Sequence, residues 1–208
     1  MSFSLSLLYL LYLPLYLDLS EFTGARLSES VRRCALGRWM QSIFGSKLVK
    51  TVDIKCQCIF GIHHHGLLPF GSVVSIGTEA AGFADLFPHN TKRVLVAASY
   101  CFMVPFFRDF ILAGSIVDCN KWSFEKWLAR GYSVGVYPGG AREGMYATPE
   151  ADILDLKRKK GFLRLAMKHG VPVVPAYSFN EVDHYRQVLP PNNTHTHTPP
   201  LAPSPAVY

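Results

Sequence analysis

The stretch WSFEKWLARGYSVGVYPGG, residues 122–140, decides the fold class. Its first part, Trp122 to Arg130, has helical spacing and places four apolar side chains largely inward, namely Trp122, Phe124, Trp127 and Leu128. Gly131 stops this helix, and Tyr132 to Tyr137 follows at once as a strand that runs into Pro138-Gly139-Gly140. A helix that feeds directly into a strand is the repeating unit of an α/β fold.

The same alternation recurs on both sides of this stretch. Two more strands are predicted upstream, at Cys56 to Ile62 and Arg93 to Ser99. Downstream, Gly161 to His169 has apolar residues at helical spacing, Gly170 ends it, and Val171 to Tyr177 follows as a strand. Pro172 and Pro175 place that last strand at an edge of the sheet. We therefore expect an α/β domain with a mostly parallel sheet flanked by helices.

One further helix is predicted nearer the N-terminus. Ser28 is a suitable N-cap for a helix that reaches about Phe44, and one face of it carries Val31, Cys34, Ala35 and Trp39.

The composition restricts the kind of partner. Of the 208 residues, 49% are hydrophobic and only 17% are charged, and the net charge is +6. Such a chain suits a lipid surface or a phosphate-bearing cosubstrate. The basic residues are scattered without a recognition motif, so nucleic acid is not expected as a partner. The five cysteines lack a C-x-x-C pair, which favours reduced, buried thiols in a cytosol-facing domain.

The two ends of the chain differ from its middle. Residues 1–19 form an apolar segment, broken by Pro14 and followed by several arginines, which we expect to attach to a membrane with the main domain on the cytoplasmic side. The segment is shorter than the roughly 20 residues of a spanning helix, so a hairpin, a re-entrant segment and a buried helix stay open. Residues 189–208 are rich in Pro, Thr and His and are expected to be disordered. Residues 20–188 remain as the folded domain.

The first loop that carries chemistry is Phe60-Gly61-Ile62-His63-His64-His65-Gly66, at the end of a predicted strand. In an open α/β sheet the site lies at the carboxyl ends of the strands. A histidine there has a suitable pKa to take a proton from an alcohol, and the Gly66 N–H could approach a developing oxyanion. A metal cluster or a hydrogen-bonded turn is the alternative explanation of the three histidines.

The second such loop is Tyr137-Pro138-Gly139-Gly140-Ala141-Arg142-Glu143. Its glycines give backbone N–H groups access to a phosphate or a carbonyl oxygen. Glu143 could orient a histidine and Arg142 could bind an anion. Alone, P-G-G is an ordinary turn, but two such loops ending strands of one sheet indicate an active site.

These residues carry a family resemblance. Residues 59–66 resemble the F-G-x-H-P-H-G signature of the type-2 acyl-CoA:diacylglycerol acyltransferases and their monoacylglycerol and wax-ester relatives. Residues 137–143 match the Y-P-G-G-x-x-E block of that family. A third block, K-G-F…A…G…V-P…F-G-E…Y, is similar to Lys160-Gly161-Phe162 and the residues that follow as far as Glu181 and Tyr185. The likeness extends from about Leu17 to Val188.

The resemblance implies a glycerolipid-acyltransferase-like fold and acyl transfer from acyl-CoA to a lipid alcohol, diacylglycerol, which yields triacylglycerol. It implies His65 as the general base, His63 in support, and Glu143 as the group that orients His65. Backbone N–H groups of Gly66, Gly139 and Gly140 are the expected oxyanion donors. The run Lys157, Arg158, Lys159 and Lys160 is expected to hold the phosphates of coenzyme A, with Arg142 as a further anion ligand. Acyl-CoA is a cosubstrate, and no other cofactor and no metal is expected.

The resemblance also implies the endoplasmic reticulum membrane as location, with access to lipid droplets. A homo-oligomer stays open. The sequence departs from the family at His64, which replaces proline, at Asn180, which replaces glycine, and after Leu189, where a further family region is expected. Two alternatives therefore stand beside diacylglycerol acylation. One is an inactive, truncated protein that binds a membrane or lipid droplet, and the other is acylation of monoacylglycerol or a fatty alcohol.

Overall fold

The computed structural model describes residues 2–63, 68–146, 154–157 and 159–181, and it contains one five-stranded sheet. The strands are β1 (Ile59–His63), β2 (Arg93–Ala97), β3 (Ile116–Asp118), β4 (Ser133–Val136) and β5 (Val173–Tyr177). Their order across the sheet is β3-β2-β4-β1-β5, and every neighbouring pair is parallel. All carboxyl ends therefore lie at the same edge, where a ligand site of an α/β sheet is expected.

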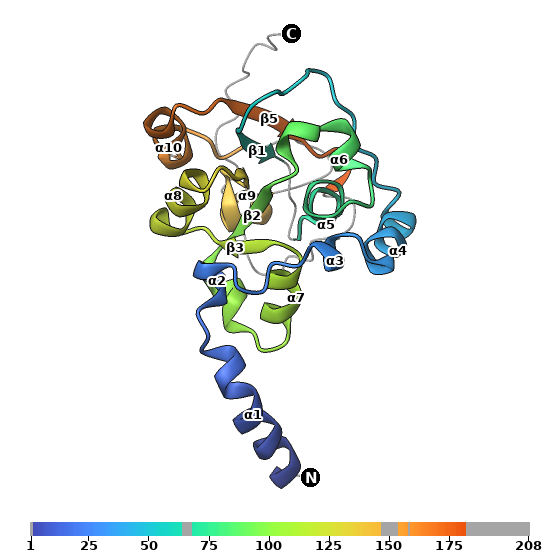
Figure 1. Cartoon of the computed structure of the whole chain (residues 1–208), viewed down its shortest axis with the longest axis vertical. Coiled ribbons are helices and arrows are strands. Elements are labelled where there is room, and N and C mark those ends of the chain that lie inside the picture. Colours follow the sequence, from blue (N-terminus) through green and yellow to red (C-terminus); the bar gives the residue numbers. More distant parts are fainter. Residues whose placement is uncertain (1, 64–67, 147–153, 158, 182–208) are drawn as a thin grey trace, which may run out of the picture.

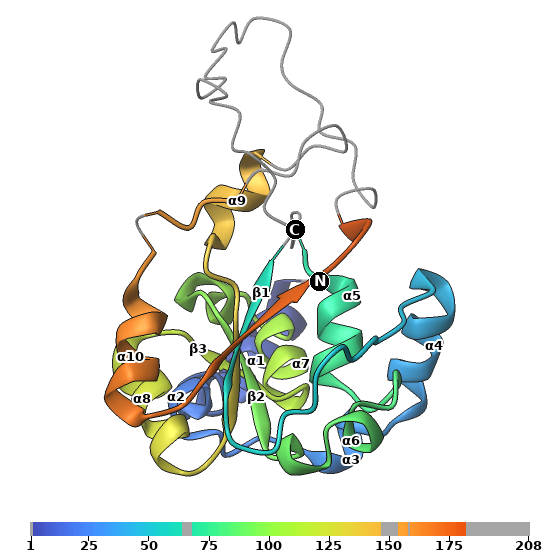
Figure 2. The ribbon, with the colours of Figure 1, turned by 90° about the horizontal axis from the view of Figure 1, so that it is seen from above.

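Helices cover both faces of the sheet (Figures 1 and 2). One face carries α8 (Lys121–Ala129) and α10 (Gly161–His169), and the other carries α5 (Phe70–Ser72) with its π-helical continuation Val73–Gly77, α6 (Phe83–Leu86) and α7 (Phe107–Ala113). The remaining α-helices are α1 (Ser2–Tyr16), α2 (Ser20–Thr23), α3 (Glu29–Arg32), α4 (Ala35–Phe44) and α9 (Gly140–Tyr146). The α/β class with a parallel sheet between helices is confirmed.

Strand alternation divides the core between the two faces. In β1, Ile59 packs with α8 and α10, whereas Phe60 and Ile62 pack with α6 and α7 on the opposite side. By the same alternation, Gly61 and His63 belong to the face of α10. The carboxyl end of β1, which carries His63, therefore faces the helix that begins at Gly161.

Several sequence predictions are confirmed. The decisive stretch forms α8 and then β4, and Gly131 between them has a φ of +79°, which favours glycine. The downstream helix has the predicted bounds Gly161–His169, and β5 is an edge strand, as its prolines indicated.

Other predictions are wrong in detail. The helix after Ser28 is two helices, because the chain breaks at Arg33 and Cys34 between α3 and α4. Trp39, which the prediction put on one face with Val31, Cys34 and Ala35, is exposed. Trp122 is likewise exposed, although its helix-mates Phe124 and Trp127 are buried. Of the five free cysteines, Cys58 is buried in the core, whereas Cys56 and Cys119 are exposed, so the expectation of buried thiols does not hold for them.

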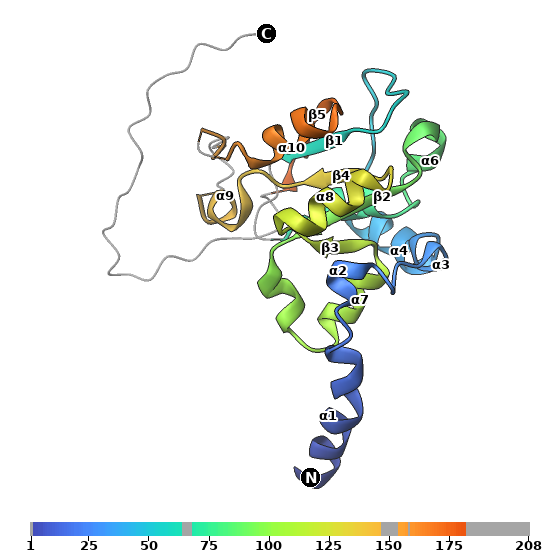
Figure 3. The same ribbon diagram turned by 60° about the vertical axis from the view of Figure 1, so that its left-hand side comes forward.

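The N-terminal segment forms α1, which projects from the rest of the chain (Figures 1 and 3). Within the described ranges, no helix combines the length and the apolar character that crossing a membrane requires. The expected membrane segment at residues 1–19 thus finds no support as a spanning helix. The predicted tail, residues 189–208, lies outside the described residues.

A charged cluster fixes the end of α1 to α7. The Arg108 guanidinium, only 1% exposed, donates to the Leu15 carbonyl at 2.9 Å and to the carboxylates of Asp18 at 2.7 Å and Glu21 at 2.5 Å. Burial raises the pKa of Asp18, but hydrogen bonds from Ser20 and Arg108 outweigh burial and hold this pKa well below its ordinary value. A deprotonated Asp18 is thus part of the contact between α7 and the segment that follows α1.

Candidate active site

Two strand ends bring a histidine and a carboxylate together. His63 is the last residue of β1, and Glu143 lies in the first turn of α9, which follows β4 and the Pro138-Gly139 turn. Nδ1 of His63 lies 3.5 Å from Oε1 of Glu143. The Glu143 residue is 1% exposed and His63 is 9% exposed, so the pair is largely withdrawn from solvent. Because β1 and β4 are neighbours in the sheet, two loops that are distant in the sequence meet at this pair.

Gly139 makes room for the Glu143 carboxylate. A Cβ atom at Gly139 would overlap the Glu143 side chain, including Oε2. The glycine is therefore required for a close approach and not only for a turn. The neighbouring Gly140 has a φ of +59° and donates its N–H to the Tyr137 carbonyl at 3.1 Å, so this amide takes part in the turn.

The second oxygen of Glu143 holds a segment that the sequence analysis did not single out. The N–H of Asp155 donates to Oε2 of Glu143 at 3.1 Å. Oδ2 of Asp155 in turn lies 3.7 Å from Nε of Arg142, whose side chain is exposed. Glu143 thus connects the histidine to residues 154–157, which border the cavity described next. No motif marks Asp155, because its partner oxygen binds a backbone N–H group.

A cavity of about 650 Å³ opens beside His63. Between β1, β5 and α10 its lining is mostly apolar, and it consists of Gly61, His63, Leu154, Leu156, Lys157, Lys159, Lys160, Phe162, Leu163, Val173, Pro175, Ala176 and Tyr177. Pockets for small ligands typically have volumes of about 300–1,000 Å³, with apolar walls and few polar groups. The cavity can therefore hold an apolar chain whose polar end lies near the histidine.

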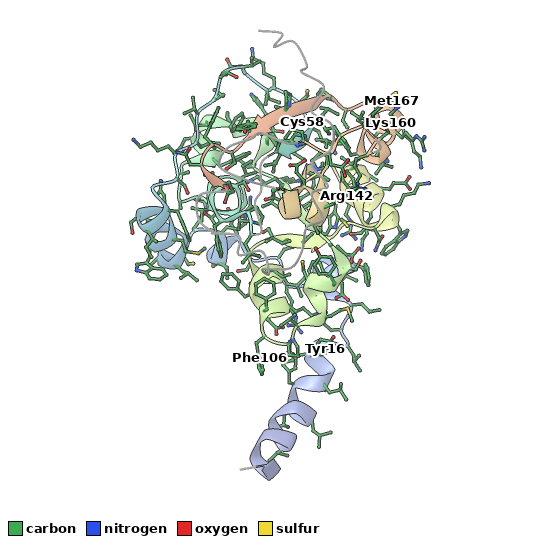
Figure 4. The ribbon with its side chains drawn as sticks, turned by 180° about the vertical axis from the view of Figure 1, so that it is seen from behind. Tyr16, Cys58, Phe106, Arg142, Lys160 and Met167 are labelled. Atoms are coloured by element: carbon green, nitrogen blue, oxygen red, sulfur yellow. The ribbon has the colours of Figure 1, made fainter. Side chains whose placement is uncertain are left out.

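Three cations border this cavity. Lys157, Lys159 and Lys160 are exposed and contribute to its lining, and Lys160 directly precedes α10. Figure 4 shows Lys160 on the same side of the molecule as Met167 of α10, and Arg142 on α9 nearer the middle of the view. Arg142 does not belong to the cavity lining within the described part of the chain. The structure thus brings three of the five predicted cationic residues to the cavity.

The remaining predicted site residues lie outside the described residues. These are His65 and Gly66 of the first loop and Arg158 of the basic run. Among the residues that the structure describes, no three His, Cys, Asp or Glu side chains converge on a point that could hold a metal ion. Of the predicted catalytic residues, the structure therefore places His63 and Glu143, and it brings these two together.

The sequence of the chain is similar to those of known acyltransferases. The family profile described as "Diacylglycerol acyltransferase" matches residues 1–198. The chain is 36% identical over 171 residues to diacylglycerol O-acyltransferase 2 of Danio rerio, covering 80% of this chain and 47% of that protein. It is 36% identical over 170 residues to acyl-CoA wax alcohol acyltransferase 1 of Mus musculus, covering 80% and 52%.

A third relative, 2-acylglycerol O-acyltransferase 3 of Homo sapiens, is 34% identical over 186 residues, covering 87% of this chain and 54% of that protein. The chain therefore spans about half the length of the curated relatives it matches. No solved structure matches it.

Proposed function

Because the chain belongs to the diacylglycerol acyltransferase family, we propose that it transfers a fatty acyl group from acyl-CoA to the hydroxyl of a lipid alcohol. The observation that carries the proposal is the His63–Glu143 pair at the edge of a largely apolar cavity with lysines on its rim. In this arrangement the acyl chain occupies the cavity, and the lysines face the coenzyme A phosphates. Diacylglycerol is the proposed acceptor, with triacylglycerol as product.

The chemistry needs a proton acceptor for the attacking alcohol. The alcohol oxygen attacks the thioester carbonyl carbon while a histidine takes its proton, and collapse of the intermediate breaks the C–S bond and returns the proton to the coenzyme A thiolate. The Glu143 carboxylate lies 3.5 Å from Nδ1 of His63, and a small approach would let it accept the Nδ1–H and leave Nε2 as the base. The geometry supports this role for His63 with Glu143. The resemblance assigns the base to His65, and we retain both assignments as separate testable proposals.

Backbone N–H groups complete the proposed chemistry. Gly66 and Gly139 are the proposed oxyanion donors, since the Gly140 N–H already binds the Tyr137 carbonyl. Arg142 and Arg158 are proposed to add positive charge for the phosphates. No further cofactor is proposed.

We further propose that the protein works at a lipid surface, the endoplasmic reticulum membrane or a lipid droplet. Many large apolar side chains of α1 and of the segment before and within α7 are exposed, and they include Leu7, Leu10, Leu11, Leu13, Leu15, Leu17, Met103, Val104, Phe106, Phe107 and Phe110. Tyr16 and Phe106 lie where α1 joins the body (Figure 4), and the Tyr12 and Phe106 rings are 4.8 Å apart. Exposed apolar surface on this scale is typical of interaction sites, including membranes.

One experiment tests the activity. The full chain is reconstituted in phospholipid vesicles and supplied with labelled acyl-CoA and, in separate reactions, diacylglycerol, monoacylglycerol, a fatty alcohol and no acceptor. We expect labelled triacylglycerol with diacylglycerol, without added metal. Acyl-CoA binding without turnover on any acceptor would overturn the proposed enzymatic activity and support the inactive lipid-binding alternative. Faster turnover on monoacylglycerol or a fatty alcohol would reassign the acceptor.

A further inference from the structure

A second buried carboxylate, Glu181, lies just beyond β5 and is only 2% exposed. It accepts hydrogen bonds from the backbone N–H groups of Gly71 at 2.7 Å and Ser72 at 3.3 Å. The hydroxyl of Ser178 donates to it at 2.5 Å. Gly71 and Ser72 belong to the short helix α5 (Phe70–Ser72), so Glu181 joins the segment after β5 to that helix.

The same short segment also holds the end of β1. The N–H of Ser178 donates to the His63 carbonyl at 2.9 Å. Residues 178–181 therefore bind His63, which precedes positions 64–67, and Gly71 and Ser72, which follow them. One segment thus fixes the spacing between the last described residue of β1 and the first turn of α5.

A third strand end is tied to this network. The hydroxyl of Ser72 lies 3.1 Å from the hydroxyl of Tyr137, the residue before the Pro138-Gly139 turn that leads to Glu143. Tyr137 packs with Phe60 and Ile62, on the face of the sheet opposite to α10. The network therefore supports the ends of β1, β4 and β5 from behind, while His63 and Glu143 meet in front.

The backbone is arranged to allow these bonds. A Cβ atom at Gly71 would lie 2.7 Å from a Glu181 carboxylate oxygen, so a side chain at position 71 would displace the carboxylate. Asn180 has a φ of +61°, a left-handed conformation that asparagine tolerates better than most residues and that reverses the chain just before Glu181. The expectation that asparagine could replace the family's glycine at position 180 is consistent with this conformation.

We propose that Glu181 is a positioning residue: its carboxylate holds the three strand ends at the separation that keeps His63 opposite Glu143. The role rests on the proposed acyl transfer. Glu181 accepts hydrogen bonds from two backbone N–H groups and one hydroxyl, and within the described residues none of these donors belongs to a Lys, Arg or His side chain. A neutral acceptor of the same shape should therefore serve nearly as well, whereas a truncated side chain should not.

The test compares Glu181→Ala, Glu181→Gln and the control Glu125→Ala, whose carboxylate pairs with Lys168 on the surface away from the site. Gln keeps an acceptor for Gly71, and its amide can donate to the Ser178 hydroxyl, whereas the Ser72 N–H then faces the amide nitrogen and loses its acceptor. We expect E181A to lower kcat roughly 10²-fold, the loss expected for a misplacement of about 1 Å, with KM for acyl-CoA little changed. E181Q should stay within about threefold of the wild type, the effect of one weak hydrogen bond, and E125A should match it.

Hydrogen exchange supplies a readout independent of turnover. In E181A the amides of Gly71 and Ser72 should exchange faster, while those of β4 keep their rates. If E181A fails to fold, Tyr137→Phe, which removes the hydroxyl contact to Ser72, decides by the same kcat measurement, with a smaller loss expected.

Three results would overturn the positioning role: wild-type kcat in E181A, a loss in KM alone, or equal damage in E181Q and E181A. A wild-type kcat in Y137F would also overturn the positioning role. If the wild type itself shows no turnover, the proposed function fails, and the exchange rates at Gly71 and Ser72 still decide whether Glu181 holds α5.

Discussion

Nδ1 of His63 and Oε1 of Glu143 lie 3.5 Å apart; His63 ends β1, and Glu143 lies in the first turn of α9, which follows the adjacent parallel strand β4. If the two act as one unit, Glu143→Gln removes the charge but keeps the shape and should lower kcat by about 10²–10⁴-fold. His63→Ala should do the same. The double variant should be little worse than either, because residues that act together lose their function together. Steady-state kinetics on the three variants measure this, and multiplicative losses would show that the two act independently.

The three histidines of the first loop can be separated by substitution. If His65 is the base, His65→Ala removes most turnover and His63→Ala removes less; if His63 is the base, the order is reversed. His64→Ala should be nearly silent, and His64→Pro, which stiffens the turn, should be as active as the wild type or more so.

Assays of these variants with and without a chelator also test the metal alternative. If all three alanine variants lose turnover equally and a chelator has the same effect on the wild type, the histidines form a metal site and are not there for proton transfer.

The requirement for glycine at position 139 is steric. Gly139→Ala places a Cβ atom against the Glu143 carboxylate and should displace it from His63, with a loss of activity and a destabilisation of about 1–3 kcal/mol. Gly161→Ala is the matched control, since a Cβ atom there meets no atom within 4 Å and the position begins α10. Turnover and thermal melting of both variants check this. A fully active G139A would show that the carboxylate tolerates displacement.

The lysines at the cavity should act on acyl-CoA binding and not on the chemical step. Exposed charge pairs contribute roughly 0.2–1 kcal/mol each, so the triple variant of Lys157, Lys159 and Lys160 to Ala should raise KM for acyl-CoA by up to about two orders of magnitude with kcat retained. Added salt should narrow the difference. Lys168→Ala, on α10 but paired with Glu125, is the control. A fall in kcat alone would contradict phosphate binding.

Acid should release α1 from the body. The pKa of Asp18 is lowered in the folded protein, so its contribution to stability is complete above the unfolded pKa of about 3.9 and is lost as the pH falls towards the folded value. Asp18→Asn should therefore melt at a lower temperature than the wild type near pH 7, and the difference should shrink below about pH 4. Melting curves across this range check it; a difference that persists at low pH would implicate packing rather than charge.

Regular elements could be predicted where local pattern and tertiary packing agree. α8, β4, α10 and the edge position of β5 follow from apolar spacing, Gly131 and the two prolines, and the structure has all of them. β3 was not predicted, because Ile116–Asp118 is too short to show a period. Trp122 was placed inward on apolar character alone, which does not determine which face of a helix finds a partner.

The site could be predicted in part for a similar reason. Motif residues at strand ends gave His63 and Glu143 as candidates, since parallel strands bring their carboxyl ends together. The pairing of Glu143 with His63 and its bond to Asp155 depend on the path of α9 and the following segment, which no local pattern records. The sequence indicated Glu181 only as one position of the third motif, because the backbone N–H groups that it binds leave no pattern in the sequence.

Two glycines, Gly71 and Gly139, each leave space for one buried carboxylate, Glu181 and Glu143 respectively. Each glycine and its carboxylate thus depend on each other sterically. A lineage that gains a side chain at position 139 loses the place of Glu143, and one that loses Glu181 is released from the need for glycine at position 71. Across the family the members of each pair should therefore change together, 71 with 181 and 139 with 143.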